Sequence, residues 1–178
     1  MQCFDSLLSD VAQARLEPDF ALYQAVIDYI ETFLFRFHHP KEDQFIFPAL
    51  RKRTQGCEAL LVELERQHER GDVLLDGLRN ALEVYQRNPG TRQRQEFEHA
   101  VNAYHDFEWQ HMLKEERELF PLVEEHLMDE DWAEIDQVFG SHEDPLFGEE
   151  VQEEYQSLYQ HIVDQYGDDW RHPAHTLV

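Results

Sequence analysis

Apolar residues recur every three or four positions along most of this chain, which is the spacing that lines one face of an α-helix. No segment shows the sustained alternation of apolar and polar residues that a half-buried strand requires. The segments between glycines and prolines are rich in Leu, Glu, Gln, Arg and Ala, which favour helix. The pattern therefore predicts an all-α protein.

Four helices joined by short connections are expected in the first 128 residues. They are predicted at 4–15, from 19 onward, at 58–87 and at 91–127. The side chain of Asp19 can cap the second helix, and Asn88-Pro89-Gly90 is a turn signal between the third helix and the fourth. Helices with short connections pack best as an antiparallel four-helix bundle, so we expect residues 1–128 to form one.

Beyond His126 the helical register breaks, and residues 129–178 are expected to form a helical extension packed on the bundle. A short helix is predicted at 131–139, a loop at 140–148, and an amphipathic helix at 149–166 along the outside of the bundle. Residues 171–178 have no periodicity and are expected to be loose.

The charge balance narrows the partners that this chain can have. It carries 15 Lys and Arg against 38 Asp and Glu, a formal net charge of −23. Such a surface repels phosphate backbones and anionic lipid headgroups, so neither nucleic acid nor a membrane is expected as a partner. The chain has only two cysteines, no signal peptide and no run of about 20 apolar residues, so we expect a cytoplasmic protein.

Five titratable residues fall on helix faces that are otherwise apolar. They are His38, Glu42, His68, His111 and Glu115. Burying an ionised carboxylate on such a face costs roughly several kcal/mol unless it is paired or coordinated. No Lys or Arg stands on these faces, so a metal cation is the simplest counter-charge. Imidazole and carboxylate ligands suit iron, manganese or zinc better than calcium or magnesium.

The same short pattern occurs twice in the chain. His38-His39-Pro40-Lys41-Glu42-Asp43 and His111-Met112-Leu113-Lys114-Glu115-Glu116 are offset by a constant 73 residues, and both lead into Phe-Pro. His and Glu four residues apart lie on one face of a helix. A single such pair is common on exposed faces, and a lone core histidine such as His68 is more often a satisfied core residue than a ligand. The repeated pair is far more specific, and we interpret its four residues, with His68, as metal ligands.

These two stretches resemble the hemerythrin-like (HHE cation-binding) family, and Leu64-Glu65-Arg66-Gln67-His68 resembles the third-helix His motif of that family. The segments 131–136 and 144–148 are similar to an extension found in its bacterial members. The resemblance covers most of the chain, from about Phe4 to Tyr166.

The resemblance implies a four-helix bundle that holds a non-heme diiron centre, two iron ions joined by an oxo or hydroxo group. By it, Glu42 and Glu115 bridge the two ions, and His38, His68 and His111 are terminal ligands. Hemerythrins bind O2 at an open position on one iron and hold it at the peroxide level. Other relatives are implied to sense O2 or iron, to handle peroxide or nitric oxide, or to store iron.

The chain departs from this family in two places. The family places a ligand His on the first helix, and residues 1–15 contain none, so either that helix is incomplete in this sequence or the ligand is missing. Cys3 and Asp5 are weak substitutes. Marine oxygen carriers also have a second third-helix His, where this chain has Asp72, a further candidate ligand. Both changes leave an iron more open, which suits reactivity better than reversible O2 carriage.

The remaining polar candidates have weaker signals. His39 follows His38 by one residue and points about 100° away from it on a regular helix, so we expect it in an outer layer of the site or at the surface. Glu108 is either a hydrogen-bond acceptor for a ligand imidazole or a solvated residue, and Tyr104 is either a donor to bound oxygen or plain core. Cys57 has no neighbour that marks it as a nucleophile. The other histidines, expected at the surface, are His99, His105, His126, His142, His161, His172 and His175.

Three hypotheses follow for the function. The leading one is a diiron protein that binds O2 or a related small molecule. The second is an iron-binding or iron-sensing module without O2 chemistry, and the third is a metal-free helical interaction domain. The sequence leaves open whether there is catalytic turnover, whether the chain is a monomer or a homodimer, and whether it has a protein partner.

Overall fold

The computed structural model describes residues 17–139 together with 156, 158, 160 and 164, except the side chains of 36, 37, 138 and 139. Within these residues the elements are all helical and none is a strand, so the predicted all-α class is confirmed. The helix predicted at 4–15 and the segments predicted at 140–148 and 171–178 lie outside the described residues, as does most of 149–166. None of the helices described is long and apolar enough to cross a lipid bilayer.

The chain divides into two compact units, one made of 1–29 with 143–178 and the other of 30–142. In the first unit, α2 (Phe20–Ile30) begins where the sequence predicts. The Leu22 backbone N–H donates to Asp19 Oδ1 over 3.0 Å, so Asp19 caps the helix. Tyr23 and Ile27 bury the apolar face.

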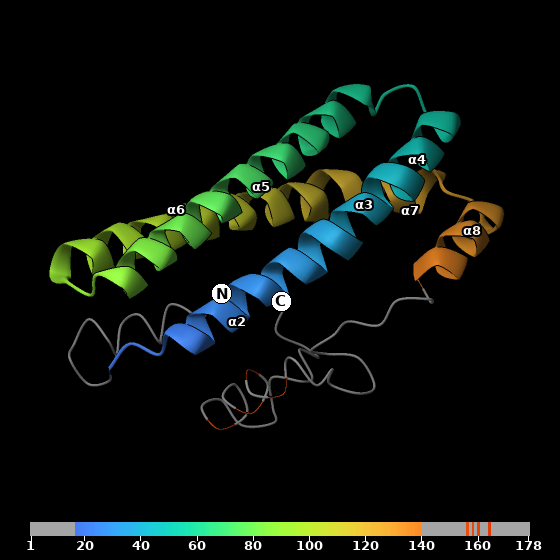
Figure 1. Cartoon of the computed structure of the whole chain (residues 1–178). Helices are drawn as coiled ribbons and strands as arrows, with labels where there is room; N and C mark the ends of the chain where they lie inside the picture. The colour runs from blue at the N-terminus through green and yellow to red at the C-terminus, as the bar shows by residue number, and fades with distance from the viewer. Residues whose placement is uncertain (1–16, 140–155, 157, 159, 161–163, 165–178) are drawn as a thin grey trace. The chain divides into compact units, whose positions relative to one another are not determined.

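The second unit contains the helical hairpin of α5 (Glu58–Arg87) and α6 (Thr91–Lys114), with bounds that match the prediction for the third helix and the start of the fourth. Figure 1 shows these two helices side by side and antiparallel. The buried apolar residues of the two helices are Leu61, Leu64, Leu75, Leu78, Leu82, Tyr85, Phe97, Val101 and Tyr104. His68 and His111 stand on the same faces, so packing of the apolar residues carries both imidazoles inward.

The helical segment between α2 and α5 is not a uniform α-helix. It runs through η1 (Glu31–His38), α3 (His39–Lys41), η2 (Glu42–Ile46) and α4 (Phe47–Arg53), where η marks a π-helix. The helix after α6 does the same, with η3 (Glu115–Leu119) and then α7 (Phe120–His126). The second and fourth predicted helices therefore exist, but each changes its turn at the repeated motif.

These wide turns coincide with prolines. In a π-turn an N–H bonds the carbonyl five residues back, as Phe47 does with Glu42 and Phe120 with Glu115. Pro48 and Pro121 follow at once. A proline has no N–H and its ring clashes with the carbonyl four residues back in a regular helix. The wider turn removes that clash, so the helix accommodates each proline with a π-turn.

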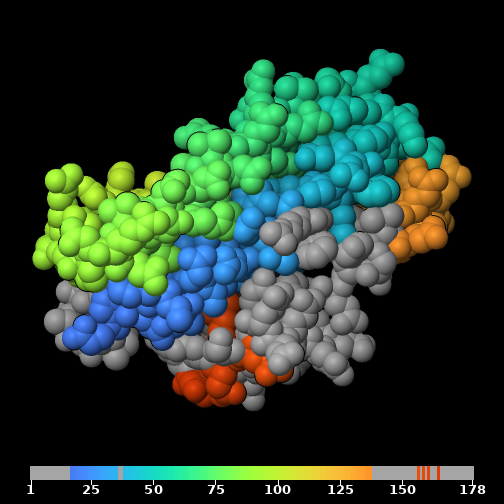
Figure 2. Space-filling view, in the orientation of Figure 1, coloured from blue at the N-terminus to red at the C-terminus, as the bar shows by residue number. Residues whose placement is uncertain are grey.

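A compact apolar cluster closes one end of this unit. It includes Phe47, Leu50, Leu61, Leu64, Leu119, Val123 and Ile135. Ile135 comes from α8 (Asp129–Phe139), which starts two residues before the helix predicted at 131–139. Arg53 donates to both oxygens of Asp131, over 2.7 and 3.0 Å, and ties α8 to α4. Figure 2 shows α8, in orange, against the end of the unit where α4 lies.

Candidate metal centre

The five residues singled out by the sequence come from three helical stretches of the second unit. His38 is the last residue of η1, and Glu42 and Glu115 are the first residues of η2 and η3. His68 stands within α5 and His111 near the end of α6. Glu42 is 1% exposed and Glu115 is 4% exposed, whereas the His38 side chain is 33% exposed. Four of the five are therefore buried among apolar side chains.

The first of two groups brings the carboxylates together. His38, Glu42 and Glu115 each place one ligand atom within 4.8 Å of the others. His38 Nε2 lies 3.6 Å from Glu42 Oε1 on the same helix, while Glu115 reaches the group from a different helix. Two carboxylates this close, both out of water, require positive charge between them.

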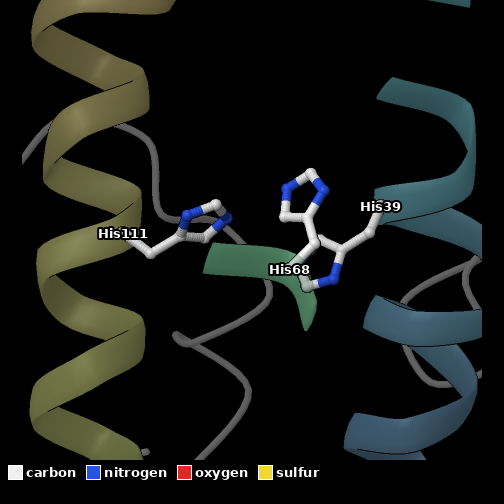
Figure 3. A group of neighbouring side chains, drawn as sticks. All are labelled: His39, His68 and His111. Carbon is white, nitrogen blue, oxygen red and sulfur yellow. The ribbon is translucent and has the colours of Figure 1, made fainter. Parts of the chain in front are cut away.

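The second group consists of three imidazoles. His39, His68 and His111 also place ligand atoms within 4.8 Å of one another, and all three are buried. Figure 3 shows their rings directed into the same space. The His39 ring stacks on His68 at 4.1 Å between centroids, and the centroid of His111 lies 5.0 Å from that of His68.

Of the two positions expected for His39, an outer layer of the site or the surface, the surface position is wrong. His39 is 4% exposed. The expectation assumed a regular helix, but η1 precedes His39 and its N–H bonds Leu34 O, five residues back. A wide turn shifts the inward face of the helix by about one residue. The sequence signal for this shift is Pro40, because a proline disfavours a regular turn at this point.

Hydrogen bonds decide which ring nitrogens face the centre. His68 Nδ1 lies 3.0 Å from Asp43 Oδ1, and His111 Nδ1 lies 3.0 Å from Gln67 Oε1. Both oxygens are acceptors, so each Nδ1 carries the proton and donates it. Gln67 is held in this orientation because its Nε2 donates to Glu63 Oε1 over 2.9 Å. In the neutral form of each ring, Nε2 of His68 and of His111 then carries the free lone pair that binds metal.

The pKa values of two of these imidazoles are shifted in opposite directions. Burial, together with the neighbouring His68, His38 and His111, lowers the pKa of His39 to about 2. Burial also lowers the pKa of His68, but the nearby carboxylates of Asp43 and Glu42 outweigh burial and raise it to about 9. A cation at the centre competes with the proton that His68 otherwise holds between these carboxylates.

Several buried atoms at the centre have no hydrogen-bond partner among the described residues. They are Glu42 Oε2, Glu115 Oε1, His68 Nε2, His111 Nε2 and both ring nitrogens of His39. His111 Nε2 and Glu115 Oε1 approach to 2.9 Å without hydrogen-bond geometry. Leaving buried polar atoms unpaired is costly, and here the lone pairs converge. The donor set, imidazole nitrogen with carboxylate oxygen, fits a transition-metal cation.

A further acidic residue lies beside this centre. Glu108 is 6% exposed, so the alternative of a solvated Glu108 is wrong. The Nδ1 protons of His68 and His111 are donated to Asp43 and Gln67 and not to Glu108. Burial raises the pKa of Glu108, and burial followed by the charge of Glu108 raises the pKa of Tyr104. Gly71 makes room: a Cβ there would lie 3.2 Å from Glu108 Oε1.

An open groove of about 450 Å³ reaches the imidazole group from outside. His39, His68 and Asp43 line it, together with Asp72. Asp72 is exposed and belongs to neither ligand group, so its proposed ligation has no support in this geometry. Burial, with Asp76 and Glu31, raises the pKa of Asp72.

The other sequence candidates lie away from the two groups. Cys57 is buried in the apolar cluster, His99 is exposed, and His105 and His126 are partly exposed. Cys3 and Asp5 lie outside the described residues, as do His142, His161, His172 and His175.

Comparison with known proteins agrees with the donor set. A family model described as "Hemerythrin HHE cation binding domain" matches residues 3–123. The zinc finger protein BRUTUS-like of Arabidopsis thaliana is 29% identical over 104 residues, which is 57% of this chain and 8% of that protein. The chain thus spans less than a tenth of that relative. No solved structure matches the chain.

Proposed function

The chain belongs to the hemerythrin HHE cation-binding domain family, and from that premise we propose that it holds two iron ions and binds O2, peroxide or nitric oxide at them. The proposed ligands are His38, Glu42, His68, His111 and Glu115. In this proposal Glu42 and Glu115 would be shared by the two ions, as would an oxo or hydroxo group, and each histidine would hold one ion.

The unpartnered buried atoms support this proposal most. Glu42 and Glu115 come from different helices, and each has an oxygen without a hydrogen-bond partner among the described residues. Nε2 of His68 lies 3.4 Å from Glu42 Oε2, and Nε2 of His111 lies 2.9 Å from Glu115 Oε1. His68 thus reaches Glu42 from another helix, while His111 and Glu115 lie one turn apart on the same helix. Both contacts bring an imidazole nitrogen to a carboxylate, as in a metal site of a helix bundle.

The chain's own groups hold and shield the ions. Asp43 and Gln67 fix the rings of His68 and His111 by their Nδ1 protons. The apolar cluster around Phe47 and Leu119 excludes water from one side, and the groove beside His39 admits a small molecule from another. Bound there, a pair of iron ions supplies two electrons to a molecule such as O2.

A second candidate is an iron sensor without O2 chemistry. The buried carboxylates Glu42 and Glu115 favour it, because a metal that neutralises them stabilises the fold and so couples occupancy to structure. A metal-free interaction domain is disfavoured, since it leaves the same atoms unpaired.

Iron content tests the centre. Protein from iron-replete cells is expected to carry about two iron ions per chain, the number that two bridging carboxylates serve. Glu115→Gln is expected to lose most of the iron, whereas Glu116→Gln, one residue on and exposed, keeps it. Less than one iron per chain in the parent protein, with Glu115→Gln no different, rejects the proposal.

Absorption spectra separate the two candidates. O2 chemistry predicts that the colour of the iron-loaded protein bleaches with dithionite and returns in air. An iron sensor predicts a melting temperature that depends on iron and a spectrum that does not respond to O2.

A further inference from the structure

We infer that His39 is a metal ligand and completes a three-imidazole subsite with His68 and His111, next to the carboxylate subsite of His38, Glu42 and Glu115. The inference rests on the proposed function, because it assigns a further ligand to the same centre. It makes the two metal positions chemically different.

Geometry is the first argument. The ligand atoms of His39, His68 and His111 lie within 4.8 Å of one another and come from three helices, α3, α5 and α6. Two nitrogens bound to one ion at about 2.1 Å each lie up to ~4.2 Å apart, so the three nitrogens are close to the spacing that one ion needs. The stacked rings of His39 and His68 must tilt apart for both lone pairs to meet at that ion. Figure 3 shows the three rings facing one another.

The environment of His39 is the second argument. It is a buried imidazole, and neither ring nitrogen has a hydrogen-bond partner among the described residues. A histidine that merely fills the core normally hydrogen-bonds at least one nitrogen. Phe35 contacts the ring edge-on at 4.9 Å between centroids, and His68 stacks on it at 4.1 Å. These contacts orient the ring but satisfy neither nitrogen.

The backbone explains how His38 and His39, adjacent in the sequence, lie in two different subsites. η1 ends at His38 and α3 begins at His39, and the two ring planes make an angle of 57°. His38 therefore joins the carboxylates while His39 joins the imidazoles. The second copy of the repeat has Met112 in the place of His39, and Met112 is 44% exposed. The extra imidazole thus belongs to one half of the centre only.

The chemistry of the ligands distinguishes the subsites. Three imidazoles suit borderline cations such as Co²⁺, Zn²⁺ or Fe²⁺, whereas a subsite with a single imidazole beside the shared carboxylates suits harder ions. We therefore expect stepwise filling, with the His39 subsite binding Co²⁺ first.

Titration of the metal-free full chain with Co²⁺ under argon tests this. The parent protein is expected to bind two Co²⁺ in distinguishable steps, and His39→Phe, which keeps the ring and removes the nitrogens, weakens one step by at least about tenfold. His39→Met, the residue of the other repeat copy, behaves as His39→Phe does. His99→Gln, an exposed histidine, changes neither step.

The outcomes separate the inference from the proposed function. If the parent protein binds two Co²⁺ and His39→Phe binds both with unchanged affinity, His39 only packs and the inference is overturned. If the parent protein binds fewer than one Co²⁺, the proposed centre itself fails.

A measurement on the parent protein tests the inference without requiring any variant to fold. The proton NMR spectrum of the Co²⁺-loaded chain is expected to show four hyperfine-shifted exchangeable imidazole N–H signals, from His38, His39, His68 and His111. Three such signals would overturn the inference whether or not the His39 variants fold.

Discussion

Gln67 Oε1 lies 3.0 Å from His111 Nδ1, and the two residues come from facing helices. The contact fixes the proton on Nδ1 and turns Nε2 toward Glu115, 2.9 Å away. An amide that no metal touches therefore orients a proposed ligand from the other helix.

Gln67→Ala is expected to weaken iron binding by roughly 10–100-fold, because the His111 ring loses its orientation. Competition of the protein with a chelator of known affinity measures the change. Gln110→Ala, on an exposed face near His111, is the matched control and should leave affinity unchanged. Equal affinities in the two variants would show that the Gln67 contact does not orient the ring.

Removing metal is expected to lower the free energy of unfolding. A ligand present at about 1,000 times its dissociation constant stabilises a fold by roughly 4 kcal/mol per site. For a chain of this size that corresponds to a melting temperature about 8–16 °C lower after chelation. Calorimetry before and after dialysis against a chelator gives the difference. An unchanged melting temperature would mean that the buried carboxylates find their counter-charge elsewhere.

Glu42→Gln is expected to stabilise the metal-free protein while abolishing its response to metal. Glu42 is 1% exposed and Oε2 has no hydrogen-bond partner among the described residues, so removing its charge relieves roughly 1–3 kcal/mol. Urea unfolding of metal-free and metal-loaded samples measures both effects. A metal-free variant less stable than the parent would contradict the prediction. Glu116→Gln serves as the exposed control.

The Arg53–Asp131 pair predicts a pH dependence on the acid side. Hydrogen bonds from Arg53 and then from the Met128 N–H lower the pKa of Asp131 in the folded state. The contribution of this pair to the free energy of unfolding is therefore complete above the pKa of Asp131 in the unfolded chain, about 3.9. It is lost as the pH falls through the lower pKa of Asp131 in the folded protein. Asp131→Asn should melt earlier than the parent protein near pH 7, and the gap should shrink below about pH 4. A gap that is constant from pH 7 to pH 3, or that Glu134→Gln reproduces, would contradict this assignment.

Two glycines of α5 offer a paired test of packing. A Cβ at Gly77 would meet nothing within 4 Å, so Gly77→Ala should stabilise the fold by about 1 kcal/mol through helix propensity. A Cβ at Gly71 would lie 3.2 Å from Glu108 Oε1 and from Phe35 Cζ, so Gly71→Ala should gain less or lose stability. Thermal unfolding measures both. Equal gains would mean that Glu108 and Phe35 move aside freely.

The helices and the convergence of the two repeat copies could be predicted from the sequence, because both depend on local periodicity. The bounds of α5, 58–87, follow from apolar spacing and the turn signal at Asn88-Pro89-Gly90. The place of His39 does not follow, because a π-turn changes the face to which every later residue belongs. The roles of Asp43 and Gln67 depend on contacts between helices, which spacing along one helix does not contain.

The wide turns after Glu42 and Glu115 each accommodate one residue more than an ordinary helical turn does. A chain that lost one residue between Glu42 and Phe47 could regain the ordinary turn without changing the face of the positions beyond it, so Leu50 would stay in the apolar cluster in which it is fully buried. A residue gained there would instead rotate every later position by about 100°. Natural variants of this segment should therefore tolerate the loss of one residue and exclude the gain of one.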